Sequence, residues 1–183
     1  GSPLLPYPTL CRSLTSKNEA HETARRVAVQ IAHRAADPRN KGQLPLRQAE
    51  LVSSSGLAAI AVPAEFGGLG ASVQTVVETV RLISTADGGV GQLLQIHNVM
   101  LRGISTGYPY KLRSRLFTHV LSATPFGNAL SKVGAKTKSP PSTRARPRAA
   151  GRWFITATML YPTAPHLHWW TAPPSPRHAP GHA

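Results

Sequence analysis

The chain has 183 residues, a length that suits one domain or a domain with part of another. Its net charge is +14, and the charge is uneven, because Asp87 is the last acidic residue and twelve Lys and Arg residues follow it. The sequence contains no run of about 18 apolar residues, which excludes a transmembrane helix. Its single cysteine, Cys11, excludes an internal disulfide framework and a Cys-rich zinc site, and we expect a cytoplasmic protein.

The first helix is predicted from the capping-box spacing of Ser16 and Glu19, after an irregular lead-in over residues 1–15. Small and apolar residues then recur at spacings of three and four, which predicts one buried stripe of Ala20, Ala24, Val27, Ile31 and Ala35. Asp37-Pro38 ends this helix, because proline disfavours helical backbone in the residue before it.

The second helix is predicted over residues 44–55, with Pro45 near its first turn and Gly56 at its end. A short buried segment, LAAIAVP, follows at residues 57–63. The glycines at 67, 68 and 70 predict a loop. Their spacing is not that of a dinucleotide-binding loop, so we interpret them as a structural turn.

Three more helices complete the predicted bundle. Ser72 caps a helix that runs to residue 86, with an apolar face made of Val73, Val76, Val77, Val80 and Ile83. The segment Asp87-Gly88-Gly89 predicts a turn, and residues 90–104 predict a very apolar helix. The last helix spans residues 110–121, with Leu112, Leu116 and Val120 in register. The fold class is therefore mainly α, with a helical domain over residues 16–124.

The character of the chain changes after Pro125. Residues 126–131 and 153–161 predict two strands, and we expect an incomplete β domain over residues 125–163. The tail, residues 164–183, has no repeating apolar pattern, and we expect it to be irregular. The pair His166 and His168 has no third ligand in a credible fold nearby, so we predict no metal site.

Two segments carry a resemblance to a known family. The segment SGLAAIAVPAEFGGLG (residues 55–70) resembles the N-terminal helical domain of acyl-CoA dehydrogenases, and TADGGVGQLLQIHNVML (residues 85–101) is similar to its next helices. The segment FGNALSKVGAKT (residues 126–137) looks like the start of the middle β domain in the FMN-dependent monooxygenase branch, which includes dibenzothiophene and sulfone monooxygenases. Acyl-CoA dehydrogenases tend to carry a Thr-Glu pair where this chain has Ser131-Lys132.

This resemblance implies a site, a cofactor and partners. His97 and Asn128 would be the catalytic residues, and the flavin would be bound by Phe126, Asn128, Ser131, Tyr161 and Thr163. Amide, hydroxyl and imidazole groups suit this task, because a flavin needs a few aimed hydrogen bonds in a water-poor pocket. The cofactor would be FMN, reduced by a separate flavin reductase. The substrate would be a small molecule, and the enzyme a tetramer-like homo-oligomer.

Three alternatives stay open at this point. One is a true acyl-CoA dehydrogenase that uses FAD. Another is a module that binds nucleic acid through the basic residues 132–152, an interpretation that the absence of an aromatic residue from this run disfavours. The third is a non-functional product: residues 138–183 resemble a shifted reading frame, and we expect the chain to be C-terminally truncated and inactive alone.

Overall fold

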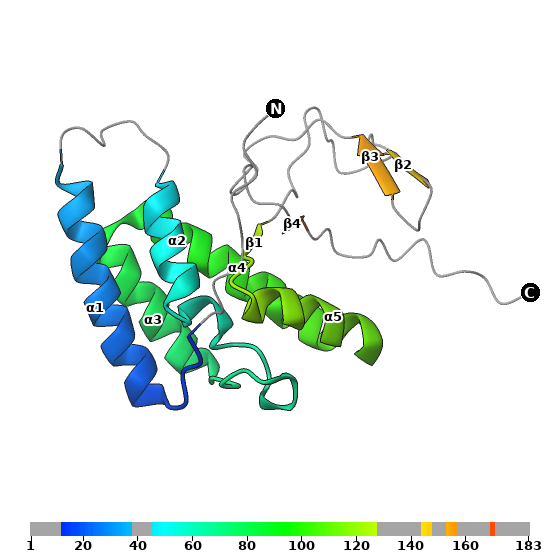
Figure 1. Cartoon of the computed structure of the whole chain (residues 1–183), viewed down its shortest axis with the longest axis horizontal. Coiled ribbons are helices and arrows are strands. Elements are labelled where there is room, and N and C mark those ends of the chain that lie inside the picture. The colour runs from blue at the N-terminus through cyan, green and yellow to red at the C-terminus, as the bar shows by residue number, and fades with distance from the viewer. Residues whose placement is uncertain (1–11, 38–44, 128–143, 148–152, 157–168, 171–183) are drawn as a thin grey trace, which may run out of the picture.

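The computed structural model describes residues 12–37, 45–127, 144–147, 153–156 and 169–170. In Figure 1 the helices α1, α2 and α3 lie side by side, while α4 runs behind them and continues toward α5. Two groups of buried residues form the core. One lies among α1, α2, α3 and the start of α4, and the other lies among the end of α4, α5 and the strand β1.

Helix α1 spans Lys17–Ala35 and begins as its sequence predicts. The Ser16 hydroxyl accepts a hydrogen bond from the Glu19 N–H at 3.1 Å, which satisfies one of the free donors of the first turn. Four of the five residues of the predicted stripe are buried, namely Ala20, Ala24, Val27 and Ile31. The prediction is wrong for Ala35, which is exposed because the last turn of α1 extends past the residues that it packs against.

Helix α2 spans Leu46–Ser54 and is followed by two short 3-10 turns, η2 at Leu57–Ala59 and η3 at Ala64–Phe66. The helix starts two residues later than predicted, and Pro45 takes the N-cap position next to the first turn. Gly56 has a φ of 94°, a left-handed conformation that glycine adopts without a steric cost. This conformation turns the chain from α2 directly into η2.

Helices α3 (Val73–Ala86) and α4 (Gly88–Gly107) are joined by Asp87 alone. The predicted turn over residues 87–89 is therefore wrong. The Asp87 carboxylate accepts hydrogen bonds from the N–H groups of Gly89 at 2.8 Å and Val90 at 3.0 Å, so that α4 begins at once. A Cβ atom at Gly91 would overlap Ser84, which shows how closely α4 approaches α3 at this corner.

The buried face of α3 agrees with the predicted one at Ile83, which is buried, and at Val76 and Val80, which are half-buried against the same core, but not at the other two positions. Val73 is 63% exposed and Val77 is 59% exposed, whereas the buried residues are Thr75, Thr79 and Ile83. Threonine tolerates burial here because the Thr79 hydroxyl donates to the Thr75 carbonyl at 2.9 Å. Because the sequence pattern counts threonine as polar, the predicted buried face of α3 is turned about the helix axis relative to the observed one.

Helix α5 spans Tyr110–Leu121, as predicted. Its buried residues are Phe117 and Val120, whereas the predicted core position Leu112 is 37% exposed. The chain then enters β1 at Phe126–Gly127, and Phe126 is buried with Val62, Leu101 and Ile104. The first strand of the predicted β domain thus begins inside the core of the bundle.

The remaining strands are short. β1 pairs in parallel with β4 (Trp169–Trp170), and β2 (Arg144–Pro147) pairs antiparallel with β3 (Trp153–Thr156). The predicted strands at 126–131 and 153–161 are confirmed where the structure describes them, and their other residues lie outside the described part. The prediction of an irregular tail is wrong at Trp169–Trp170, which form β4 by pairing with β1, and the other residues of the tail lie outside the described part. No helix among the described residues has the length and hydropathy to cross a bilayer.

We predict that Gly68→Ala lowers the free energy of unfolding by about 1–3 kcal/mol, because the added Cβ would overlap the backbone and side chain of Val62. Gly103→Ala is the matched control. Gly103 lies in α4 with no atom within 4 Å of the added Cβ, and a helical alanine there should stabilise the protein by up to about 1 kcal/mol. Urea unfolding followed by circular dichroism measures both, and equal effects would contradict this account of the turn.

Candidate functional site

His97, one of the site residues predicted from the sequence, has a buried imidazole ring. His97 lies on α4 and is 2% exposed. Its Nδ1 accepts a hydrogen bond from the Phe126 N–H at 2.8 Å, and its Nε2 lies 2.8 Å from the Ala58 carbonyl oxygen. Since a carbonyl can only accept, Nε2 carries the hydrogen and donates it. Both contacts are satisfied together only by the neutral ring with its proton on Nε2.

These two hydrogen bonds connect three separate parts of the chain. His97 belongs to α4, Ala58 to η2 and Phe126 to β1. The imidazole and the Phe126 ring are also stacked, with centroids 6.1 Å apart and an angle of 14° between their planes. His97 therefore fixes both the position and the direction in which β1 leaves the helical bundle.

Burial lowers the pKa of His97 to about 4, and the hydrogen bond with the Ala58 carbonyl acts in the opposite direction. Burial dominates because the charged ring would lose its hydration in an apolar environment. Protonation would also put a second donor on Nδ1, facing the N–H of Phe126. The folded protein therefore holds His97 neutral at physiological pH.

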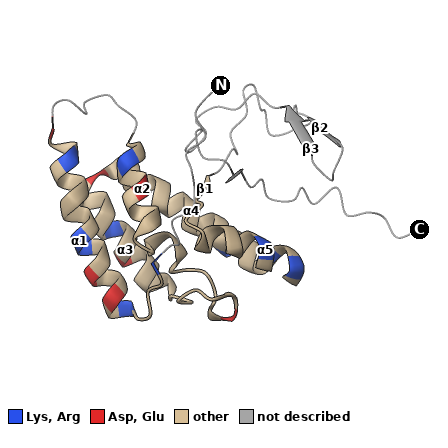
Figure 2. Ribbon diagram, viewed as in Figure 1, with Lys and Arg blue, Asp and Glu red and all other residues tan. Residues whose placement is uncertain are grey.

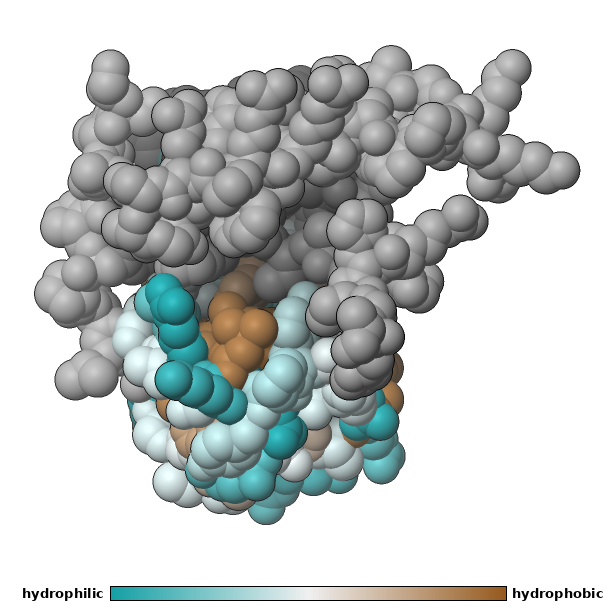
Figure 3. Space-filling view, turned by 90° about the vertical axis from the view of Figure 1, so that its right-hand side faces the viewer, coloured by the Kyte–Doolittle hydropathy of each residue, from teal (hydrophilic) through white to brown (hydrophobic). Residues whose placement is uncertain are grey.

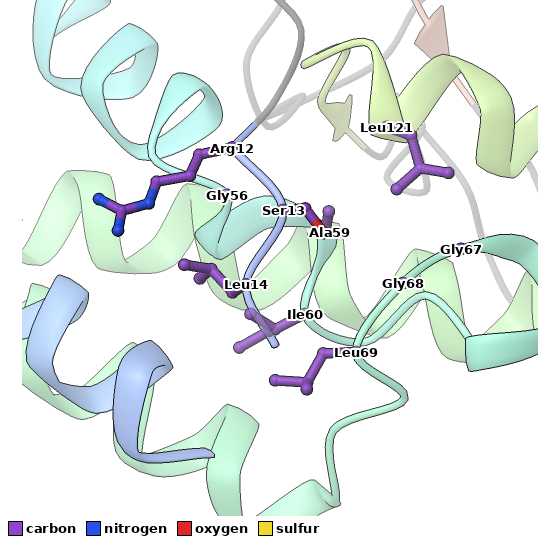
Figure 4. Close-up of a pocket in the computed structure, with 10 residues that line it drawn as sticks. All are labelled: Arg12, Ser13, Leu14, Gly56, Ala59, Ile60, Gly67, Gly68, Leu69 and Leu121. Carbon is purple, nitrogen blue, oxygen red and sulfur yellow. The ribbon is translucent and has the colours of Figure 1, made fainter. Parts of the chain in front are cut away.

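Two cavities lie near these elements. One of about 30 Å³ is lined by His97 together with Ala58, Leu94 and Pro125. The other, of about 170 Å³, is shown in Figure 4, where Leu14, Ile60, Leu69 and Leu121 form apolar walls and Arg12 lies at the edge. Both volumes are below the roughly 300 Å³ at which pockets for drug-sized ligands begin. Neither cavity is large enough for a flavin.

The structure brings together two of the predicted site residues, His97 and Phe126. The other four, Asn128, Ser131, Tyr161 and Thr163, lie outside the described residues. A proton-exchange role for His97 stays a prediction, as does flavin contact by Phe126, which is 1% exposed and turned into the core. In the part of the chain that the structure describes, no group of three or more potential metal-binding side chains is found.

The loop of three glycines makes the turn that its sequence predicts. Gly67 and Gly70 have φ values of 90° and 62°. The Gly70 N–H donates to the Val62 carbonyl at 2.8 Å, and the Gly67 N–H donates to the Ala64 carbonyl at 2.9 Å. These amides close the loop on itself, which confirms the structural interpretation.

Two buried polar groups at or next to His97 were not predicted from the sequence. One is the Ala58 carbonyl, which leaves no side-chain signal in the sequence. The other is Asn98, which is 7% exposed and donates from its amide to the Leu94 carbonyl at 2.8 Å, while its own Oδ1 is buried with no hydrogen-bond partner. An asparagine inside a very apolar helix was the available signal for this position.

Comparison with known proteins agrees with this architecture. The family model for the acyl-CoA dehydrogenase N-terminal domain matches residues 16–108. A probable FMNH2-dependent monooxygenase, SfnC of Pseudomonas putida, is 30% identical over 87 residues, which cover 48% of this chain and 22% of SfnC. The dibenzothiophene monooxygenase of Rhodococcus erythropolis is 35% identical over 80 residues, covering 44% of this chain and 19% of that enzyme. The chain therefore matches about a fifth of the length of these relatives.

The solved structure of FMN-bound TdsC from Paenibacillus sp. A11-2, a dibenzothiophene monooxygenase, has a similar fold. The TM-score is 0.63 at 25% sequence identity, over 80% of this chain and 36% of TdsC. The described helices thus correspond to one part of a much longer enzyme fold.

We predict that the protein loses stability as the pH falls from about 6.5 to about 4. The unfolded state binds a proton at His97 near its ordinary pKa of 6.5, whereas the folded state binds it only near 4. The stability present above pH 6.5 is therefore lost across this window, by at most about 3 kcal/mol. Urea unfolding at pH 7.5, 6, 5 and 4 measures this loss.

The variant His97→Gln should flatten this pH dependence while lowering stability at neutral pH. The matched control is His33→Gln, which replaces an exposed histidine on α1 and should leave the slope unchanged. An unaltered slope in His97→Gln would show that another group causes the pH dependence.

Proposed function

Because the chain belongs to the family of acyl-CoA dehydrogenase N-terminal domains, we propose that it forms the helical wall of a flavin-dependent oxidoreductase of the FMN-dependent monooxygenase branch. The observation that carries the proposal is the bond between His97 and Phe126, which fixes the chain two residues before Asn128. The start of the segment predicted to contact the flavin is thereby held against the bundle. The full enzyme would oxygenate a small molecule.

FMN is favoured over FAD as the cofactor. The relatives SfnC and TdsC are described as FMNH2-dependent and FMN-bound respectively. When bound and reduced, FMN supplies the electrons with which such an enzyme activates oxygen. A monooxygenase of this kind needs a separate reductase to reduce the flavin, and we include that partner in the proposal.

The described residues do not form a flavin site by themselves. Both nitrogens of His97 bond to backbone groups, Phe126 is buried, and the cavity beside them measures about 30 Å³. In the proposal, flavin contacts come from residues beyond β1, at Asn128, Ser131, Tyr161 and Thr163. His97 then acts as a positioning residue through Phe126, and a direct exchange of its proton would require one of its two hydrogen bonds to break.

The alternative of an FAD-dependent acyl-CoA dehydrogenase has less support. The glutaryl-CoA dehydrogenase of Mycobacterium smegmatis is similar in fold at 19% identity, which informs the fold alone. No observation on the described residues favours a thioester substrate. A homo-oligomer and a cytoplasmic location stay predictions.

We predict that the 183-residue chain binds FMN saturably and FAD more weakly, as measured by flavin fluorescence during titration. Asn128→Ala should weaken FMN binding about tenfold, because one lost hydrogen bond to a ligand costs about 1–1.5 kcal/mol. His97→Gln should also weaken binding by misplacing β1, while His33→Gln should not. Binding of neither flavin would refute the proposal, and tighter binding of FAD together with octanoyl-CoA would favour the dehydrogenase.

A further inference from the structure

Helix α5 presents a basic surface with exposed apolar side chains. Lys111 and Arg115 are exposed and four residues apart, so they lie on one face of the helix. Figure 2 shows Lys and Arg on α5 and no acidic residue on it. Beside them Tyr110 is 61% exposed and Leu112 is 37% exposed. We call these four residues, Tyr110, Lys111, Leu112 and Arg115, the α5 surface.

Tyr110 is exposed but held in place. Its ring centroid lies 5.2 Å from that of Phe66, and the Arg113 guanidinium lies 5.8 Å from the Tyr110 centroid and 5.4 Å from the Phe66 centroid. Arg113 is itself anchored, because it donates to the Ser105 carbonyl at 3.1 Å. An aromatic side chain that is already ordered loses little conformational entropy on binding, which is a property of residues that dominate interfaces.

This chain has few carboxylates that could neutralise the α5 surface. Four of its acids, Glu19, Glu50, Glu65 and Glu78, each contact an arginine other than Arg115, and Asp87 caps α4. Among the described residues, neither Lys111 nor Arg115 makes an ion pair. The sequence after Asp87 has no acid and carries eight further Lys and Arg residues beyond residue 127, which would be repelled. A second copy of this chain would offer equally few carboxylates to the α5 surface.

We propose that the α5 surface binds a carboxylate-rich face of another protein. An ordered tyrosine beside exposed cations fits protein interfaces, where tyrosine and arginine are enriched. Nucleic acid fits less well, because two exposed cations on one helix offer few phosphate contacts and affinity for nucleic acid scales with their number. In the view turned toward the side on which α5 lies in Figure 1, the described surface shows a hydrophobic area with strongly hydrophilic residues along one side of it (Figure 3). This inference is independent of the proposed flavin chemistry.

The test uses the whole chain and a fluorescein-labelled peptide of four Glu-Glu-Leu repeats, with binding followed by fluorescence anisotropy at 50 mM and 200 mM NaCl. The double variant Lys111→Glu with Arg115→Glu should weaken binding at least tenfold at the lower salt concentration, since two attractive contacts become repulsive. Tyr110→Ala should weaken binding about fivefold at both salt concentrations, because an apolar contact is not screened by salt.

The matched control is Lys17→Glu with Arg26→Glu, which makes the same change in net charge at exposed positions of α1 and should weaken binding less than twofold. Circular dichroism verifies that each variant is folded, and Lys111→Gln with Arg115→Gln repeats the test without charge reversal. An equal loss in the α5 and α1 variants would overturn the proposal, because net charge alone would then explain binding. Tighter binding of a 12-nucleotide single-stranded DNA that depends on Lys111 and Arg115 would also overturn it.

Discussion

The hydrogen bond from the Phe126 N–H to the neutral imidazole of His97 joins the helical bundle to the strand that follows it. This bond depends on the ring being held in one tautomer, which the Ala58 carbonyl ensures from the other side. Ala58 is in turn placed by the turn at Gly56, whose left-handed backbone leads α2 directly into η2. The exit of β1 therefore depends on local geometry that begins some seventy residues earlier in the chain.

Helix α4 is the element that makes this connection possible, because it is shared by both core clusters. Val90 and Leu94 pack with α1, α2 and α3, whereas Leu101 and Ile104 pack with α5 and β1. His97 lies between these two sets on the same helix. A polar residue at the boundary of two apolar clusters is buried from both sides, which explains why its charged form is so strongly disfavoured.

The helical elements could largely be predicted from the sequence, since capping residues and apolar spacing are local signals. Ser16 and Ser72 cap helices as predicted, whereas Asp87 was interpreted as part of a turn because two glycines follow it. The face of α3 is predicted only in part: Val76, Val80 and Ile83 pack against the core, but Thr75 and Thr79, whose hydroxyls are hydrogen-bonded, are buried in place of Val73 and Val77. His97 could be singled out from the sequence, but its partners could not: they are main-chain atoms of residues 39 and 29 positions away.

Both hydrogen-bond partners of His97 are main-chain atoms. For these two bonds, substitutions are therefore restricted more strongly at position 97 than at positions 58 and 126. Every residue at position 58 supplies a carbonyl, and every residue except proline at position 126 supplies an N–H. Neither hydrogen bond therefore requires a particular side chain at position 58 or 126, although the Phe126 ring also stacks on the imidazole. Only position 97 requires a particular side chain for these two hydrogen bonds. That side chain must donate one hydrogen bond and accept another from atoms as far apart as the two nitrogens of an imidazole ring.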